Sequence, residues 1–486
     1  MNVHSTSPEF KQNAARALND SQLQKALGNV KQGFIDKRRM AADKLPEFEA
    51  LRDSARDIKN HTLEHLDLYL EAYEQKVTEA GGFVHWAATA EDARNIVLGI
   101  CRDAGARRVT KGKSMVAEEI ALNAALEAAG MDVAETDLGE YIIQIRHEGP
   151  SHIIAPAIHL NRDQVEADFR RVHKDLPEGR SLLEPAELVS EARGVLREKF
   201  VRADVGITGA NFLIAETGSS VIVTNEGNGD LTQLLPRVHV VVTSIEKLVP
   251  TLDDVSTILR VLARSATGQD MSMYTTFSTG PRRQYDPDGP DAYHVVLLDN
   301  GRTEMLGSEF QDMLRCIRCG ACMNHCPVYG AVGGHAYGWV YPGPMGAVLT
   351  PGLIGVHEAG HLPNASSFCG RCEAVCPMGI PLPKMMRHWR EREFTRGDSP
   401  WLQRMAVKAW AHVARRPKLY RFLTNRMAGL LAEWGKPRGN FRWLPLADGW
   451  LKHRDLPAPP GRTFQMLWKK ELDDRRFEAE MRQQRR

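Results

Sequence analysis

The spacing of hydrophobic residues divides the chain into regions of different periodicity. Over residues 1–80 apolar side chains are spread among many charges, and the pattern at 51–77 predicts helix and no strand. From Gly81 onward, short β-branched runs such as FVHWA (83–87) alternate with helical stretches such as 90–105. This alternation predicts a layered α/β domain with a mostly parallel sheet over about residues 81–305.

The same patterns predict the individual elements of this domain. Strands are expected at 83–87, 107–112, 131–137, 151–156, 204–216, 219–226, 239–245, 273–280 and 292–300. Helices are expected at 90–105, 116–130, 161–172, 184–200 and 253–266.

The chain changes character again after residue 305. Ser308 and Gln311 have the spacing of a capping box, which predicts a short helix leading into a cysteine motif. Residues 330–360 contain nine glycines and three prolines, which predicts an irregular connection. After Pro377 the pattern is helical to the end, with interruptions at 435–440 and 456–461.

Seven of the eight cysteines lie in two tight groups, a spacing typical of metal sites. The first group is CIRCGACMNHCP, with Cys316, Cys319, Cys322 and Cys326. The second is SSFCGRCEAVCP, with Cys369, Cys372 and Cys376. Structural zinc sites use two separated Cys-x2-Cys pairs, so this spacing fits zinc poorly and favours iron–sulfur clusters.

The cysteine before proline ligates the other cluster in two-cluster ferredoxins, so crossed ligation is expected here. One cluster would be bound by Cys316, Cys319, Cys322 and Cys376, and the second by Cys326, Cys369 and Cys372. The leading position of the second motif is Ser366. The fourth iron of the second cluster would then be held by Ser366, by a nearby histidine such as His335, by water or by a partner protein. If none of these binds it, the cluster is of three-iron type.

Two other patterns point to different chemistry. His357-Glu358-x-x-His361 matches the zinc-peptidase pattern, but Gly355, Gly360 and Pro363 disfavour the stable helix that this chemistry needs. KGKS, at 111–114, lacks the glycine spacing of a phosphate-binding loop, and no Gly-x-Gly-x-x-Gly follows the first strand. Cys101, in an apolar helical face, is expected in the core.

The α/β domain has one candidate ligand site. At the carboxyl ends of its strands Lys113, Glu216, Thr217, Asn225 and Glu226 could hold a small anionic or polyhydroxy ligand. The alternative for ETGSS, at 216–220, is a turn between two strands, with its glycine at positive φ.

Charge is distributed unevenly along the chain. Residues 384–486 contain 25 Lys/Arg and 11 Asp/Glu (25 − 11 = +14), so the remainder carries about −12 of the net +2. Seven of nine tryptophans lie in the same stretch, which favours a surface for an acidic partner or a membrane face; the alternative is a solvated helical domain.

Without an apolar run of 18 residues or a secretory signal, we expect a cytoplasmic protein, either free or peripheral at the inner membrane face, that binds no nucleic acid.

The order of these features resembles the lactate utilization protein B family, the iron–sulfur subunits of bacterial L-lactate oxidation systems. The resemblance rests on residues 113–145 and 151–160, on TGANFLIAETGSSVIVTNEGN (208–228) and on both cysteine motifs. It implies two [4Fe–4S] clusters with the ligands given above, and the missing cysteine as a family trait. It also implies two sister proteins, one cysteine-rich and one a smaller relative of the α/β domain, with L-lactate as the substrate of the complex.

Four parts are therefore expected: a helical region (1–80), the α/β domain (81–305), a ferredoxin-type iron–sulfur domain (306–385) and a basic, Trp-rich helical region (386–486). The leading hypothesis is an electron-transfer subunit of a complex that oxidises L-lactate to pyruvate. One alternative is a self-contained oxidoreductase that acts on another small hydroxy acid. Another is a relay for a dehydrogenase of the glycolate or glycerol 3-phosphate type, although such relays usually lack the α/β domain. No catalytic residue is predicted.

Overall fold

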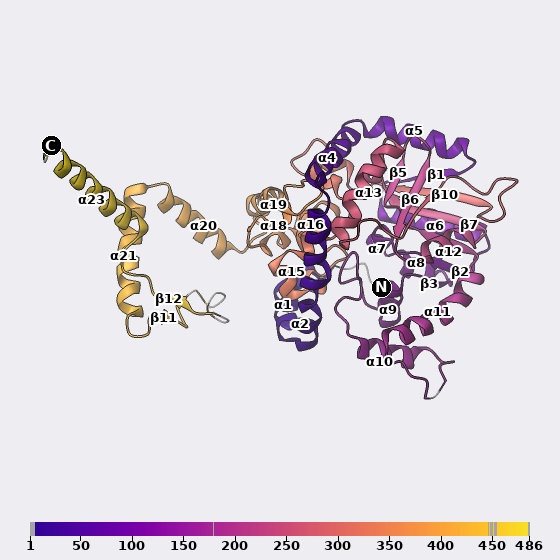
Figure 1. Ribbon diagram of the computed structural model, residues 1–486, viewed down its shortest axis with the longest axis horizontal. Coiled ribbons are helices and arrows are strands. Elements are labelled where there is room, and N and C mark those ends of the chain that lie inside the picture. The colour runs from indigo at the N-terminus through magenta and orange to yellow at the C-terminus, as the bar shows by residue number, and fades with distance from the viewer. Residues whose placement is uncertain (1–4, 178, 446, 448–450, 452–453, 485–486) are drawn as a thin grey trace. The chain divides into compact units, whose positions relative to one another are not determined.

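The computed structural model describes residues 5–177, 179–445, 447, 451 and 454–484, which form two compact units that divide at Gly397 (Figure 1). The boundaries expected at 80, 305 and 385 stay predictions. Residues 5–80 are mostly helical, as predicted. Their helices are α1 (Phe10–Asn19), α2 (Ser21–Gly28), a π-helical segment (Lys31–Asp36), α3 (Lys37–Asp43), α4 (Phe48–Glu64) and α5 (Leu66–Glu79).

A six-stranded parallel sheet forms the centre of the first unit. Its order is β1 (Phe83–Ala87), β10 (Ala292–Leu298), β7 (Val238–Ser244), β4 (Val205–Thr208), β2 (Arg108–Lys111) and β3 (Asp132–Glu135). Every pairing in this sheet is parallel, which confirms the predicted fold class. Runs of Val, Ile and Leu fill β4, β7 and β10 because both faces of such a sheet are covered.

Helices cover the two faces of this sheet. On one face, a core cluster joins the strands to α6 (Ala90–Asp103), α7 (Met115–Glu119) and α8 (Leu122–Ala128). Cys101 is fully buried in that cluster, which confirms its expected place in the core. On the other face, α4 lies against α13 (Leu252–Ala266) and α5 against β1 (Figure 1).

A second sheet of four strands was not predicted. Its order is β8 (Leu248–Val249), β5 (Phe212–Ile214), β6 (Ser219–Thr224) and β9 (Tyr274–Ser278). The stretch 204–216, expected as one strand, therefore divides between β4 of the first sheet and β5 of the second. β5 and β6 are antiparallel neighbours, and Gly218 between them has φ +69°, which confirms the turn interpretation of ETGSS.

Two further predictions for this region were wrong. The expected helix at 116–130 is broken into α7 and α8, because Ala121 adopts a left-handed conformation with φ 48°. The expected strand at 151–156 is a loop. His152 Nδ1 accepts hydrogen bonds from the Ile154 and Ala155 amides, and these local bonds replace strand pairing. The other helices of the domain are α9 (Leu138–Arg146), α10 (Arg162–Val172), α11 (Pro185–Val201) and α12 (Asn228–Leu234).

The cysteine region that follows is mostly short helices. They are α14 (Ala321–Asn324), α15 (Pro327–Val332), α16 (Gly343–Ile354), α17 (Val356–Ala359), α18 (Arg371–Ala374) and the longer α19 (Leu382–Arg396). The predicted irregular connection was wrong over α16, which is a regular, mostly buried helix. Its glycines permit close packing, since a Cβ on Gly346 would lie 1.7 Å from the Tyr341 carbonyl oxygen.

The predicted capping box was also wrong. Ser308 Oγ accepts the Phe310 amide, whereas Gln311 Oε1 accepts the Gly307 amide. The reciprocal pair of a capping box is therefore not formed, and the segment Gln311–Arg315 is a short 3₁₀ helix.

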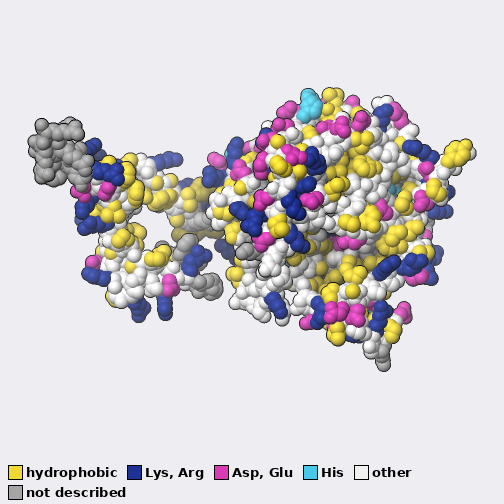
Figure 2. Space-filling model, in the orientation of Figure 1, with side chains coloured by type: hydrophobic (Ala, Val, Ile, Leu, Met, Phe, Trp, Pro, Cys, Tyr) yellow, Lys and Arg dark blue, Asp and Glu magenta, His cyan; other side chains and the backbone are white. Residues whose placement is uncertain are grey.

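The second unit is helical, as predicted, with a small hairpin. It contains α20 (Trp401–Ala414), α21 (Pro417–Gly435), β11 (Asn440–Phe441), β12 (Leu456–Pro457) and α23 (Phe464–Gln484). The two strands fall at the predicted interruptions and pair antiparallel. Large apolar side chains such as Trp401 and Trp410 are exposed on α20, and Figure 2 shows apolar side chains interleaved with Lys and Arg in this unit. Among the described residues, no helix has the length and apolarity needed to span a membrane.

Candidate iron–sulfur site

The two cysteine motifs repeat the same local backbone geometry. Arg318 and Gly320 are left-handed around Cys319, and Phe368 and Gly370 are left-handed around Cys369. In each motif the glycine begins a four-residue helix, α14 or α18, that carries the next cysteine. Counting back by the same three residues, Ser366 stands where the first motif has Cys316.

Cys376 lies with three cysteines of the first motif. Burial, together with the neighbouring Cys376 and Cys316 thiols, raises the pKa of the Cys319 thiol to about 12. Burial also raises the pKa of Cys322, and Cys316, Cys319, Cys376 and Cys372 add to that effect. These contributions indicate that Cys376 lies near the cysteines of the first motif, and that Cys372 of the second motif lies within electrostatic range of Cys322 as well.

Cys326 lies instead with the cysteines of the second motif. Burial raises the pKa of Cys372 to about 12, with a further contribution from Cys326. Burial likewise raises the pKa of Cys326, to which Cys369 contributes. Cys369 is exposed, and a hydrogen bond from the Arg371 amide lowers its pKa. These three cysteines line one small cavity together with Ser366.

The chemistry of this donor set fits iron–sulfur clusters. All seven thiols are free of disulfides. Clusters are held by thiolates, and a bound metal offsets the cost of deprotonating buried thiols. Arg52 donates a hydrogen bond to the Cys376 carbonyl oxygen, 2.7 Å away, and Arg38 to that of Val375, 2.8 Å away, so cations lie near this anionic group.

The Ser366 hydroxyl already has a partner. Its oxygen accepts a hydrogen bond from the Phe368 amide at 3.1 Å, as in a local serine turn. Ser366 nevertheless lines the cavity beside Cys326, Cys369 and Cys372.

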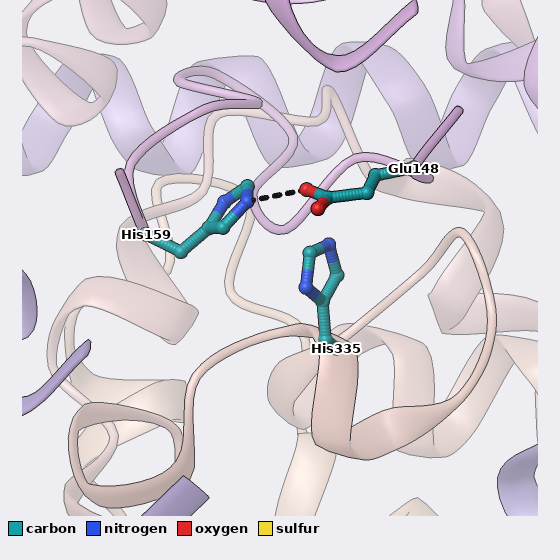
Figure 3. Close-up of side chains that lie close together, drawn as sticks. All are labelled: Glu148, His159 and His335. Carbon is teal, nitrogen blue, oxygen red and sulfur yellow. Dashed lines mark hydrogen bonds and ion pairs between the residues drawn. The ribbon is translucent and has the colours of Figure 1, made fainter. Parts of the chain in front are cut away.

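His335, considered above as a ligand of the second cluster, takes part in a different contact. Its Nε2 hydrogen-bonds to the Gly149 carbonyl oxygen at 2.8 Å, and its ring packs edge-on against His159. Figure 3 shows both imidazoles beside Glu148, whose carboxylate lies 2.9 Å from His159 Nε2. Arg146 pairs with the same carboxylate at 3.0 Å. These contacts connect the loop after α9 to the segment after α15.

The peptidase pattern does not form a zinc-binding helix. α17 ends at Ala359, before His361. His361 Nε2 hydrogen-bonds to the Ser7 carbonyl oxygen, so its ring binds the N-terminal segment.

A buried ion-pair network lies next to the first motif. Arg302 contacts Glu119 at 2.7 Å and Glu246 at 2.8 Å, and all three side chains are almost completely buried. Glu246 also pairs with Arg318 of the first motif at 3.3 Å. The Tyr341 hydroxyl donates to Glu119 at 2.7 Å. Burial opposes the charge of Glu246, but Arg302 and Arg318 outweigh it and lower its pKa to about 2.

A cavity of about 290 Å³ lies at the carboxyl ends of the central strands. Of the predicted ligand residues, Lys113, Asn225 and Glu226 line it. Glu216 and Thr217 do not: the Glu216 carboxylate accepts the Leu252 amide, and the Thr217 hydroxyl donates to Ser219.

Three residues at these sites escaped prediction: Arg318, Lys247 and His152. Lys247 follows β7, so the rule that ligands bind at strand carboxyl ends could have indicated it. Arg318 lies inside CIRC, where the cysteines alone define the pattern. His152 Nε2 bonds to Asn324 Oδ1 of α14 at 2.9 Å, a contact that no local signal reveals.

Family models match three consecutive segments of the chain between residues 70 and 473. Residues 70–298 match the LUD domain, 312–380 the 4Fe-4S dicluster domain and 380–473 the C-terminal domain of lactate utilisation protein B. Lactate utilization protein B of Bacillus velezensis is 41% identical over 95% of this chain and 96% of its own.

The chain belongs to the lactate utilization protein B family. The homologue from Bacillus licheniformis is 42% identical over 97% of both chains. An uncharacterized electron transport protein of Escherichia coli (strain K12) is 42% identical over 97% of this chain and 98% of its own. A solved structure of a DUF162 family protein from Deinococcus radiodurans covers 48% of this chain and 98% of its own, at 16% identity and a TM-score of 0.27. The predicted family is thus confirmed, and the dicluster match supports iron–sulfur clusters at the cysteine region.

Proposed function

We propose that this protein carries electrons through two iron–sulfur clusters during the oxidation of L-lactate to pyruvate, as one subunit of a complex. The relatives named lactate utilization protein B and the electron transport protein support this role. The single observation that carries it is the meeting of Cys326 with Cys369 and Cys372 at one small cavity, which brings cysteines of both motifs together.

In this proposal each cluster takes ligands from both motifs. The first is a [4Fe–4S] cluster held by Cys316, Cys319, Cys322 and Cys376. The second is held by Cys326, Cys369 and Cys372, either as a [4Fe–4S] cluster with a non-cysteine fourth ligand or as a three-iron cluster. When bound, such clusters accept and donate single electrons. The chain's part is to hold them, to exclude water and to set their charge environment through Arg38, Arg52 and Arg318.

The partners in this proposal are the sister lactate utilization proteins, one cysteine-rich and one a smaller relative of the α/β domain. The exposed apolar side chains of α20, interleaved with basic ones, supply a surface of the kind found at protein interfaces. The positive charge of the same unit also supports a second role, in which the unit binds peripherally to the inner face of the membrane.

The test is lactate-dependent reduction of the clusters. Protein purified without oxygen should contain about seven to eight iron atoms and no stoichiometric zinc. With both sister proteins present, L-lactate should bleach the visible absorption and produce a paramagnetic signal, whereas the isolated chain should stay oxidised. One zinc per chain with little iron would refute the cluster assignment. Iron-replete protein that lactate never reduces, even with both partners, would refute the role in lactate oxidation.

A further inference from the structure

The cavity at the strand ends lies where the topology of the sheet favours a ligand. In the order β7-β4-β2-β3, the connection after β2 leads to β3 on one side, and the chain after β4 goes on to β7 on the other. Ligands of open α/β sheets bind at such a switch point, outside the carboxyl ends of the strands. Gly112 and Lys113, directly after β2, and Gly209 and Asn211, directly after β4, line the cavity.

The size of the cavity suits a small organic molecule. Its volume of about 290 Å³ is close to the lower end of the ~300–1,000 Å³ typical of ligand pockets. A second cavity, of about 630 Å³, is lined by α11 and α12 with mostly apolar side chains, and it provides a comparison below.

Three cations line the cavity at the strand ends: Lys113, Lys247 and Arg318. Arg318 is nine-tenths buried, and only its Nη2 pairs with Glu246. Among the described residues, its buried Nε and Nη1 have no hydrogen-bond partner. A buried, unpaired guanidinium edge is costly unless an acceptor with two oxygens, such as a carboxylate, satisfies it.

The two acidic side chains that line the cavity, Asp137 and Glu226, do not supply that acceptor. Asp137 Oδ1 accepts the Gly139 and Glu140 amides and so caps α9. Burial, with a contribution from Asp137, raises the pKa of Glu226. Glu226 offers a carboxyl group that suits a hydroxyl beside a carboxylate, whereas the Asn225 amide already bonds to Gln269 and to the Met273 backbone.

We infer that this cavity binds a small 2-hydroxycarboxylate such as L-lactate, with its carboxylate held by Arg318 and Lys113. The inference rests on the proposed function for the choice of acid. It places the ligand beside the loop that carries Cys316, because Arg318 belongs to that loop. The competing role for these cations is to neutralise the thiolates of the first motif alone, in which case the cavity would bind no acid.

Calorimetric titration of the anaerobic, iron-replete chain distinguishes the two roles. L-Lactate should bind at one site per chain, while neutral lactamide and inorganic sulfate should neither bind nor compete. Lys113→Met and Arg318→Lys should each weaken lactate binding roughly tenfold or more, the loss expected for a charge-assisted hydrogen bond. Arg197→Gln, which removes a cation from the other cavity, should leave the affinity unchanged.

Three results would overturn the inference: no lactate binding to the iron-replete chain, equal affinity in all three variants, or equal binding of sulfate. If the Arg318→Lys variant loses iron, the lactate affinity of the Lys113→Met variant is the test on its own, because Lys113 lies outside the cysteine region. A chain that is reduced by lactate in the presence of its partners but does not bind lactate itself refutes this inference and leaves the proposed function intact. A chain without iron refutes the proposed function instead.

Discussion

Cys376 is the residue on which the division of the thiols between two clusters depends. It is the last cysteine of the second motif in sequence but lies near Cys316, Cys319 and Cys322. We predict that Cys316→Ser and Cys376→Ser damage the same cluster, seen as loss of the same signal in paramagnetic resonance of the reduced protein. Cys101→Ser, in the core of the α/β domain, should leave both signals. Loss in Cys376→Ser of the signal that Cys369→Ser removes would contradict crossed ligation.

Ser366 is predicted to be dispensable for the second cluster. A serine must lose a proton of high pKa to bind iron, whereas a thiol near 8.5 loses its proton easily. The hydroxyl oxygen also already accepts the Phe368 amide. Ser366→Ala should therefore keep its iron content and both reduction potentials, as measured by iron analysis and redox titration. A variant that loses one iron, or shifts only the second potential, would show that Ser366 is a ligand.

Glu148 should make the protein sensitive to acid. Burial opposes ionisation of its carboxyl, but hydrogen bonds from His159 and Arg146 outweigh it and lower the pKa from the ordinary 4.5 to about 2. The stabilisation is complete above pH 4.5 and is lost as the pH falls toward 2. Melting temperatures measured from pH 6 downward should therefore fall more steeply for the natural protein than for Glu148→Gln. Parallel curves for the two proteins would contradict this account.

At the scale of elements, periodicity predicted most of the α/β domain correctly. It failed where a local contact competes with the regular structure, as at Ala121 and at the His152 loop. It also failed at α16, because glycine and proline signal loops unless close packing requires small residues, as it does at Gly346. The second sheet could not be predicted, since pairing of β5 with β8 and of β6 with β9 depends on distant contacts.

The break between α7 and α8 gives a prediction at this scale. Ala121 has φ 48°, a conformation that costs an L-residue about 1 kcal/mol or more and glycine very little. Ala121→Gly should thus stabilise the protein by up to ~1 kcal/mol, offset in part by the greater freedom of glycine in the unfolded chain. Ala125→Gly, within α8, should instead destabilise it by about 1 kcal/mol. Urea unfolding of both variants is the measurement, and destabilisation by Ala121→Gly would contradict the explanation.

At the scale of the whole molecule, the cysteine spacing predicted iron–sulfur chemistry but not the surroundings of the thiols. Only folding brings Glu119, Glu246 and Arg302 to the first motif, from positions that carry no motif of their own. The rule that ligands bind at the carboxyl ends of strands was enough to predict that Lys113, Asn225 and Glu226 line the cavity. It could not predict Arg318, which enters the same cavity from another part of the chain.

Breaking the buried network should be costly. Glu246→Gln removes the charge that pairs with Arg302 and Arg318, and loss of one partner from a buried pair destabilises by about 3–5 kcal/mol. The matched control is Glu309→Gln, which breaks the exposed pair with Arg392 and should cost at most ~1 kcal/mol. Denaturant unfolding of the two variants provides the comparison, and equal losses would show that the network contributes no more than a surface pair.

The same network limits how this protein can be divided or recombined. The LUD and dicluster families are separate sequence units, yet Arg318 of the second needs Glu246 of the first. A cysteine region transplanted onto another carrier would take with it a buried arginine and leave its counter-charge behind. Exchange of either unit alone should therefore destabilise the recombined protein, whereas exchange of both sides of the contact together should not.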